Sequence, residues 1–386
     1  MSEQGPARAL AGLVMTAVLL AGVTIAYARA YDASPGRGPA PEPSPSSMDL
    51  VLAPVARAPV DPSPAPPWLP ASPGPSPAPP LPAPPLPPAL PADDEQLAVY
   101  RAELPPDAIE IAAVGDVNLG GTLGEVIRGR GADYPWERVA PLLQSADIAF
   151  ANFESTASVR GSPAPKAYTF RSDPASLDPM ARAGVDVVSV ANNHALDYGP
   201  EALMDTVSNL RRVGIQPVGG GANEVEAWSP AVVEAGGMRF AFVAASRVLP
   251  SGWAATAQTA GVASAYQQQR LLDEVAAAKA TGAVVVVSVH WGVERSASPE
   301  PYQVNLGRAL VEAGASVVLG HHPHVLQPVA RYRGAVIAYS LGNFVFTAPS
   351  LEQTSMILRI GWRPGGQLVV AQQPIRIVGG QPRPQN

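Results

Sequence analysis

The chain has 386 residues, a formal net charge of −6 and a pI near 5.4, and 15% of its residues are charged. A nucleic-acid surface needs clustered Lys and Arg, so this charge balance argues against a nucleic-acid partner. The absence of cysteine excludes disulfides, thiolate metal sites, a cysteine nucleophile and a cysteine-linked lipid anchor.

The first predicted element is an apolar helix over residues 9–28. The segment carries no charge and is long enough to cross a bilayer at ~1.5 Å per residue. Two interpretations of segment 1–31 remain open: an uncleaved signal anchor, which the length favours, or a signal peptide removed at Ala28-Arg29-Ala30. We therefore expect a single-pass protein of the cell membrane whose folded domain lies outside the cytoplasm, or a secreted protein if residues 1–30 are cleaved.

A proline-rich segment follows over residues 32–106. About half of the chain's 45 prolines lie between Pro35 and Pro91. Proline lacks the backbone N–H that helices and paired strands need, so this segment is typical of a disordered, polyproline-rich linker. Such a linker would hold the folded domain, expected over 107–380, away from a membrane.

In the predicted domain, buried strands alternate with amphipathic helices, and mostly strands follow. Strands are predicted at 109–119, 147–155, 185–191, 215–218, 284–292 and 316–324, then at 324–333, 334–346, 355–362 and 367–378. Helices are predicted at 120–131, 136–146, 177–184, 200–214, 265–282 and 302–314, with a hairpin at 231–246. This order indicates an α/β domain with helices outside two sheets and polar strand ends gathered at one edge.

All five histidines lie in three short segments, each directly after an apolar run. They are His194, His290, His321, His322 and His324. Imidazole is a common metal ligand and titrates near neutral pH. Histidines placed only for packing would be more scattered, so we interpret the three segments as walls of one site.

Carboxylate, amide and hydroxyl side chains follow the other predicted strands. They are Asp116, Asn118, Asn152, Glu154, Asn192, Asn193, Asp197, Glu294, Ser340 and Asn343. Nitrogen and oxygen donors without sulfur favour a divalent metal, Mn²⁺, Fe²⁺ or Zn²⁺, with one or two ions held. Two ions would clamp the attacking and leaving oxygens of a displacement and supply hydroxide near neutral pH.

Six motifs in this order carry a family resemblance: GDVNLGG, NFES, ANNHALDYG, HWGVE, GHHPHVLQP and SLGNFVF. Together they resemble the CapA family of capsule-synthesis proteins, named for poly-γ-glutamate capsule biosynthesis. Members share a domain similar to calcineurin-like metallophosphoesterases, and the resemblance covers residues 109–346. It implies a four-layer α/β/β/α sandwich of the metallophosphoesterase type, with the site where strand ends of both sheets meet.

The resemblance also implies roles for individual residues. The metal ligands it implies are Asp116, Glu154, Asn193, His290, His322 and His324, and His194 would protonate a leaving group. Supporting positions are Asn118, Asn152, Asn192, Asp197, Glu294 and Asn343. Asn118 stands where metallophosphoesterases usually have a histidine ligand, and Glu154 stands where they have a bridging aspartate. His321 receives no role.

Three functions follow from these patterns. The first is a cell-surface protein of capsule or exopolymer biosynthesis or export that acts as a metal-dependent hydrolase or transferase, with an anionic exopolymer or capsule-synthase subunits as partners. The alternatives are a non-catalytic membrane component that binds polymer or a synthase subunit, and a secreted phosphoesterase unrelated to capsule. Lys166, Arg171 and Trp253 lie in loops that could contact an anion or polymer, but solvated loop side chains are the simpler interpretation.

Overall fold

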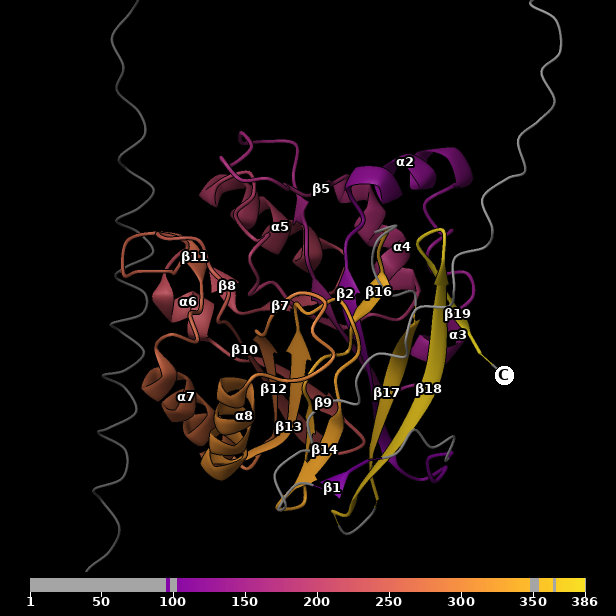
Figure 1. The fold of residues 1–386 in the computed structure, drawn as a ribbon, viewed down its shortest axis with the longest axis vertical. Helices are drawn as coiled ribbons and strands as arrows, with labels where there is room; N and C mark the ends of the chain where they lie inside the picture. The colour runs from indigo at the N-terminus through magenta and orange to yellow at the C-terminus, as the bar shows by residue number, and fades with distance from the viewer. Residues whose placement is uncertain (1–94, 98–102, 348–353, 364–365, 386) are drawn as a thin grey trace, which may run out of the picture. The chain divides into compact units, whose positions relative to one another are not determined.

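The computed structural model describes residues 95–97, 103–347, 354–363 and 366–385. The predicted segment 1–31 and the linker up to residue 94 lie outside these residues. Within them, no helix combines the length and apolar character that crossing a membrane requires. Two mixed sheets carry the fold (Figure 1), so the predicted α/β class is confirmed.

The first sheet has seven strands in the described part of the chain, in the order β1-β14-β15-β13-β12-β10-β9. Strands β10, β12, β13 and β15 run parallel, β9 and β14 run antiparallel to them, and β1 pairs antiparallel with β14. Their bounds are β1 Glu95–Gln96, β9 Ala231–Ala235, β10 Met238–Ser246, β12 Val284–His290, β13 Ala315–His321, β14 Val329–Tyr332 and β15 Ala335–Ala338. Runs of Val and Ala make the parallel strands apolar on both faces, as burial on both sides requires.

The second sheet has eight strands in the described residues, in the order β19-β18-β17-β2-β3-β6-β7, with β16 also paired to β2. Strands β2, β3, β6, β7 and β16 are parallel, and β17 to β19 form an antiparallel extension. Their bounds are β2 Ile109–Val117, β3 Ile148–Phe153, β6 Val187–Ser189, β7 Gln216–Val218, β16 Asn343–Val345, β17 Thr354–Trp362, β18 Leu368–Val378 and β19 Gln381–Pro384.

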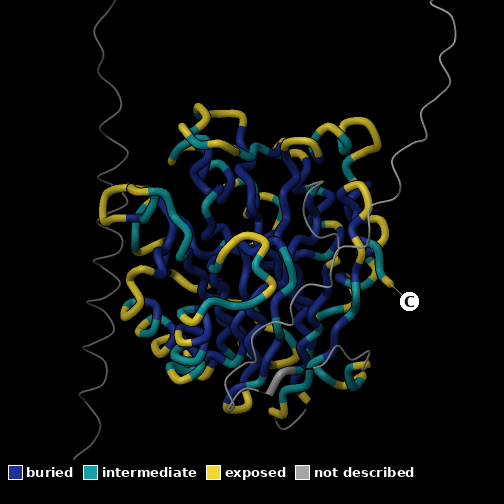
Figure 2. Tube along the Cα trace, viewed as in Figure 1, coloured by how far each residue is buried: buried dark blue, intermediate teal, exposed yellow. Residues whose placement is uncertain are grey.

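The two sheets face each other across a shared apolar core. Phe150 of β3 stacks on Phe242 of β10 with 5.6 Å between ring centroids, and Phe240 of β10 meets Trp362 of β17 at 5.2 Å. Figure 2 shows this interior as a continuous buried region, with most exposed residues in loops and on helix surfaces. The sheets are therefore fixed to one another by packing rather than by a hinge.

Helices pack on the sheets from outside this core. Helices α7 and α8 bury Leu271, Val275 and Leu310 in a second cluster with the valines of β12 and β13. Figure 1 shows these two helices beside the first sheet, and α2, α4 and α5 beyond the strand ends. The helices are α2 Gly121–Arg130, α3 Ala140–Gln144, α4 Leu177–Arg182, α5 Pro200–Arg212, α6 Glu224–Trp228, α7 Gln268–Ala280 and α8 Pro301–Ala313.

The structure corrects three of the element predictions. The segment predicted as one strand over 334–346 divides into β15 in the first sheet and β16 in the second. Gly342 has a φ of 63°, which permits the bend that carries the chain between sheets. The helix predicted over 136–146 is shorter, and α6 with its Asn223 cap was not predicted.

Candidate metal centre

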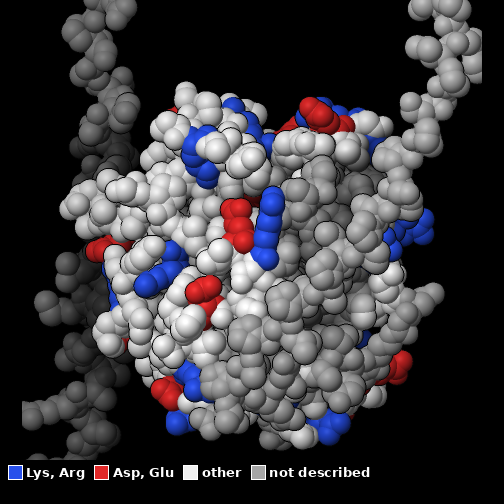
Figure 3. All heavy atoms as spheres, viewed as in Figure 1, with Lys and Arg blue, Asp and Glu red and all other residues white. Residues whose placement is uncertain are grey.

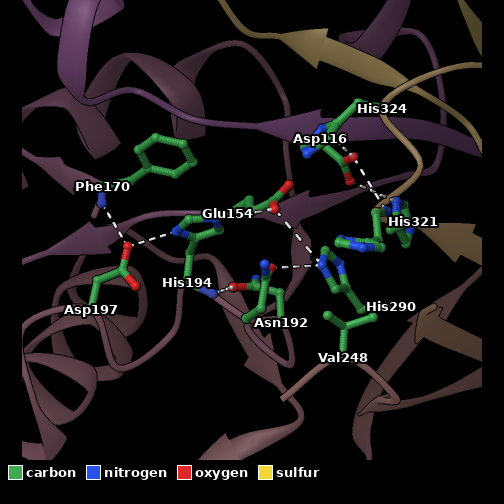
Figure 4. Close-up of polar contacts among 12 residues, drawn as sticks. Asp116, Glu154, Phe170, Asn192, His194, Asp197, Val248, His290, His321 and His324 are labelled. Carbon is green, nitrogen blue, oxygen red and sulfur yellow. Dashed lines mark hydrogen bonds and ion pairs between the residues drawn. The ribbon is translucent and has the colours of Figure 1, made fainter. Parts of the chain in front are cut away.

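The predicted polar clusters meet where the carboxyl ends of parallel strands from both sheets converge. Asp116 near the end of β2 lies opposite Asn152 of β3, while His290 at the end of β12 lies opposite His321 of β13. Glu154 follows directly after β3. Figure 4 shows Asp116, Glu154 and His290 converging from separate strand ends.

The backbone around this centre is closely packed and locally strained. A side chain on Gly115 would place its Cβ 1.9 Å from the carbonyl oxygen of Gly342, so only glycine allows β2 to approach that turn. His322 and His324 have positive φ values of 97° and 61°. Non-glycine residues rarely adopt such angles, and the strain is typical of functional sites.

Asp116 is a buried carboxylate surrounded by donors. Asn152 Nδ2 donates to its Oδ1 at 2.9 Å. His321 Nδ1 lies 3.3 Å from Oδ1 and His324 Nδ1 lies 3.4 Å from Oδ2. Burial alone would raise the pKa of Asp116, but these two imidazoles outweigh it and hold the pKa well below its usual value.

Glu154 is buried without compensation. It is fully buried, and neither carboxylate oxygen has a hydrogen-bond partner among the described residues. The imidazole atoms His290 Nε2 and His194 Nε2 lie 3.7 and 3.9 Å from Oε1. Burial and then the charge of Asp116 raise the pKa of Glu154 well above its usual value. A bound cation would supply the partner that this carboxylate lacks.

The histidines of the centre differ in protonation. Burial and then His322 lower the pKa of His290 well below its usual value, and burial with His324 lowers the pKa of His322 to about 4. Burial would also lower the pKa of His324, but Glu154 and Asp116 raise it to about 9. Neutral imidazole is the form that binds a metal, so His290 and His322 are ready as ligands at neutral pH.

Three groups of side chains have ligand atoms within 4.8 Å of one another: Glu154 with His290 and His322, Asp116 with Glu154 and His324, and Glu294 with His322 and His324. The first two groups share Glu154. His322 Nδ1 also has no hydrogen-bond partner in the described residues. Buried, unpartnered nitrogen and oxygen donors fit one or two divalent cations of the Mn²⁺, Fe²⁺ or Zn²⁺ type.

His194 lies at the rim of the centre and is held from behind. Its Nδ1 is 2.6 Å from Asp197 Oδ2, which also accepts the backbone N–H of Phe170. The Phe170 ring stacks on the imidazole with 4.0 Å between centroids. Because Nδ1 is fixed by Asp197, Nε2 is the atom that faces Glu154 (Figure 4). Burial lowers the pKa of His194 despite Asp197.

The amides divide into one at the centre and several that fix its walls. Asn193 Oδ1 lies 2.9 Å from His290 Nε2. Asn192 donates to Asn152 and to the Phe153 carbonyl and accepts from the His194 N–H, and Asn343 Oδ1 lies 2.9 Å from His324 Nδ1. Asn118 instead accepts the N–H of Gly120 and shapes the turn into α2.

Two residues have larger parts in the structure than the sequence suggested. His321, to which no role was assigned, is fully buried beside Asp116. Lys166 is not a solvated loop residue: its Nζ donates to Asp197 Oδ1 and to the Asn193 carbonyl, both at 2.6 Å. The interpretation of Lys166 as solvated was wrong because the loop folds back over the strand ends. The ANNHALDYG motif contains both of its partners but gives no signal for the lysine.

The fold and centre define a class: a mixed α/β protein with a histidine and carboxylate site between the strand ends of two sheets. The family model described as bacterial capsule synthesis protein PGA_cap matches residues 110–348. The chain belongs to this family, and the resemblance predicted from the six motifs is confirmed.

Named relatives agree with this assignment. The capsule biosynthesis protein CapA of Bacillus anthracis is 30% identical over 287 residues, which cover 72% of this chain and 70% of that protein. The PGA biosynthesis protein CapA of Bacillus subtilis (strain 168) is 33% identical over 62% of this chain and 64% of its own length. A probable polyglutamine synthesis accessory protein of Mycobacterium tuberculosis is 33% identical over 55% of this chain and 59% of its own length.

Similarity to solved structures is weaker. A putative 5′-nucleotidase from Staphylococcus aureus has a TM-score of 0.43 and 16% identity, covering 70% of this chain and 54% of that one. A hypothetical protein from Thermus thermophilus has a TM-score of 0.44 and 18% identity, covering 70% of this chain and 100% of that one. No conclusion about activity follows from matches at this level.

Proposed function

We propose that this chain is a cell-surface, metal-dependent hydrolase or transferase that acts in the biosynthesis of a capsule or exopolymer of the poly-γ-glutamate type. Its relatives are named for capsule, PGA and polyglutamine synthesis. We also propose that the domain is of the metallophosphoesterase type, with the two facing sheets and outer helices as its four layers.

The observation that carries the proposal is Glu154. A fully buried carboxylate with neither oxygen hydrogen-bonded in the described residues costs free energy. That cost is offset if a cation binds between Glu154 and the facing imidazoles. The same ligand groups fit one or two ions, with Glu154 common to both.

In this proposal Asp116, Glu154, Asn193, His290, His322 and His324 hold the metal. A bound divalent metal would make hydroxide available near neutral pH and stabilise charge on a reacting oxygen. The chain's own contribution to proton transfer is His194: its Nε2 would first take up a proton from solvent or substrate and then give it to the leaving oxygen, while Nδ1–H stays on Asp197. Asp197 stabilises the imidazolium of His194 through Nδ1 at 2.6 Å, while the stacked Phe170 ring fixes the orientation of the imidazole.

The proposed location follows from the sequence. Residues 9–28 would anchor the chain in the membrane, and the proline-rich segment would carry the domain outward to an anionic polymer or to synthase subunits. Cleavage within residues 1–30 would release it instead.

The test combines metal content with turnover. We expect the purified full chain to hold one or two equivalents of metal by elemental analysis, and chelation to abolish cleavage of a γ-linked glutamate polymer. A His322→Ala, His324→Ala double variant should lose both metal and turnover. Glu234→Gln is the matched control, because this carboxylate is exposed on β9 and belongs to none of the three ligand groups.

Each alternative predicts a different result. A folded wild-type chain that binds polymer but no metal would support the non-catalytic component. Metal-dependent turnover of simple phosphate esters with no effect on the polymer would support a phosphoesterase unrelated to capsule. Full metal content and turnover in the double variant would contradict the proposed centre.

A further inference from the structure

A cavity of about 580 Å³ opens beside the candidate metal centre. Its lining residues include Asn193, Gly292, Lys166, Arg247 and Tyr302. Asn193 contacts His290, and Gly292 follows that histidine by two positions. The cavity has the size of small-molecule sites and leads directly to the residues proposed to hold metal.

Two cations line this cavity, and its described lining contains no carboxylate. Lys166 is already committed, because its Nζ lies 2.6 Å from Asp197 Oδ1. Arg247 is different: among the described residues no carboxylate lies within ion-pair distance, and its side chain makes one long contact of 3.4 Å with the Ala265 carbonyl. Most of its five donors therefore remain available to a ligand.

The Arg247 guanidinium is also held in place. Its carbon lies 4.4 Å from the ring centroid of Tyr266 and 5.5 Å from that of Tyr302. Two aromatic faces order a guanidinium without neutralising it, which lowers the entropy cost of binding an anion. The Tyr302 hydroxyl accepts the Gly292 N–H at 2.6 Å, so this wall is fixed to the strand end that carries His290.

A backbone hydrogen bond also fixes Arg247 to the strand end that carries His290. Arg247 follows β10 directly, and its N–H donates to the His290 carbonyl at 2.8 Å. On the face that Figure 3 shows, basic and acidic side chains are interspersed and form no broad basic patch. An unpaired arginine at a fixed position beside the centre is therefore a specific feature and not part of a broad basic surface.

We propose that Arg247 binds an anionic group of the substrate, a carboxylate or a phosphate, that flanks the atoms reacting at the metal centre. This inference rests on the proposed function, since it places the substrate across both the centre and the cavity. Arg247 would determine substrate specificity. It would favour a polymer that carries a negative charge on the repeating unit next to the one that reacts.

The test is direct binding to the full chain by calorimetry, using a γ-linked glutamate oligomer, an oligophosphate of similar charge and an uncharged glutamine oligomer. Arg247→Gln should weaken binding of the charged oligomer by about tenfold or more, because a charge-assisted hydrogen bond is lost. Binding of the glutamine oligomer should change much less. Whichever charged oligomer responds to the substitution identifies the source of the anion.

Arg130→Gln is the matched control, since Arg130 lies 5.0 Å from the Tyr134 ring but outside the cavity. Arg247→Lys, which keeps the charge but loses the planar fork, should give an intermediate loss and guards against a folding defect. Unchanged binding of both charged oligomers by Arg247→Gln, or an equal loss in Arg130→Gln, would overturn the proposal. Metal content is measured on the same samples. If the Arg247 proposal alone is wrong, the wild-type chain still contains metal. If the proposed metal centre is wrong, the wild-type chain contains none.

Discussion

Glu154 is the side chain of the candidate centre whose burial costs the most free energy. It is fully buried, its oxygens have no hydrogen-bond partner among the described residues, and burial with Asp116 raises its pKa. Asp116, equally buried, is instead surrounded by an amide and two imidazoles. The two carboxylates are therefore not equivalent, and Glu154 is the one that a cation would stabilise most.

Glu154→Gln tests this difference. Glutamine keeps the shape but cannot carry the charge, so metal affinity should fall by at least about tenfold, the usual cost of disturbing even an outer partner of a metal ligand. Without metal, the free energy of unfolding should change by less than about 1 kcal/mol, since both side chains leave a neutral polar group buried. Metal titration by calorimetry and urea unfolding in chelator measure the two effects. Unchanged metal affinity in this variant would contradict the assignment of Glu154 as a ligand.

At the scale of elements, the strand ends are set by how closely neighbouring backbones approach. Gly320 precedes the histidine cluster in β13, and a Cβ there would lie 1.9 Å from the Tyr339 carbonyl oxygen and 2.6 Å from Trp291 Nε1. That same Nε1 donates to the Tyr339 carbonyl at 2.9 Å. The position therefore fixes the contact between β12, β13 and the segment after β15.

Gly320→Ala should lower the free energy of unfolding by about 1–3 kcal/mol, because backbone atoms must shift to admit the methyl group. Gly129→Ala is the matched control: it lies in α2 with nothing within 4 Å of its added Cβ. There alanine should stabilise by about 0.5–1 kcal/mol through its helix propensity. Urea unfolding of the two variants checks both signs, and equal effects would contradict the close approach at Gly320.

The loop that covers His194 is tied to α5 by an acidic residue. Asp205 accepts from Ser158 Oγ at 2.6 Å and pairs with Arg160. The hydrogen bond from Arg160 lowers the pKa of Asp205 from 3.8 to about 2. A lowered folded-state pKa means that this contribution is complete above pH 4 and is lost as the pH falls toward 2.

Asp205→Asn should remove that contribution. Its thermal midpoint should lie below that of the wild type at pH 7, and the difference should shrink as the pH falls from about 4 to about 2. The effect should be small, since Arg160 is largely exposed and water screens the pair. The other acidic residues are the same in both proteins, so their effect on the thermal midpoint cancels in the difference measured at each pH. A difference that stayed constant down to pH 2 would contradict the ion pair.

For the whole molecule, one core holds both sheets, and the centre lies at the edge that they share. Phe150 and Phe242 stack across the sheets, so the two halves of the ligand set are carried by rigid packing. The candidate ligands at or just after the ends of β2 and β3 in one sheet, and of β12 and β13 in the other, are therefore held in position by the same packing.

A further prediction for the whole molecule concerns how the folded domain is attached to the membrane. We expect deletion of residues 9–28 to move the chain from the membrane fraction to the soluble cytoplasmic fraction, because these apolar residues would both direct export and anchor the chain. Cell fractionation and N-terminal sequencing of the mature chain measure this. A mature chain that begins after residue 30 would establish cleavage and contradict the anchor.

The sequence by itself determined the α/β class, most strands and helices, the family and the gathering of histidines at strand ends. These follow from local patterns: the apolar periodicity of each segment and six motifs in fixed order. Local pattern could not show that 334–346 divides between two sheets, because both halves are apolar and only pairing decides their partners.

Only the tertiary structure decided which contacts each polar residue makes. It brought Asp116 and Glu154 within reach of His290, His322 and His324, assigned Asn118 to a turn, and placed His321 beside Asp116. It also brought Lys166 onto Asp197 and left Arg247 without a carboxylate partner in the described residues. Such contacts join segments far apart in the chain, and their distances depend on how the two sheets pack, which no local pattern encodes.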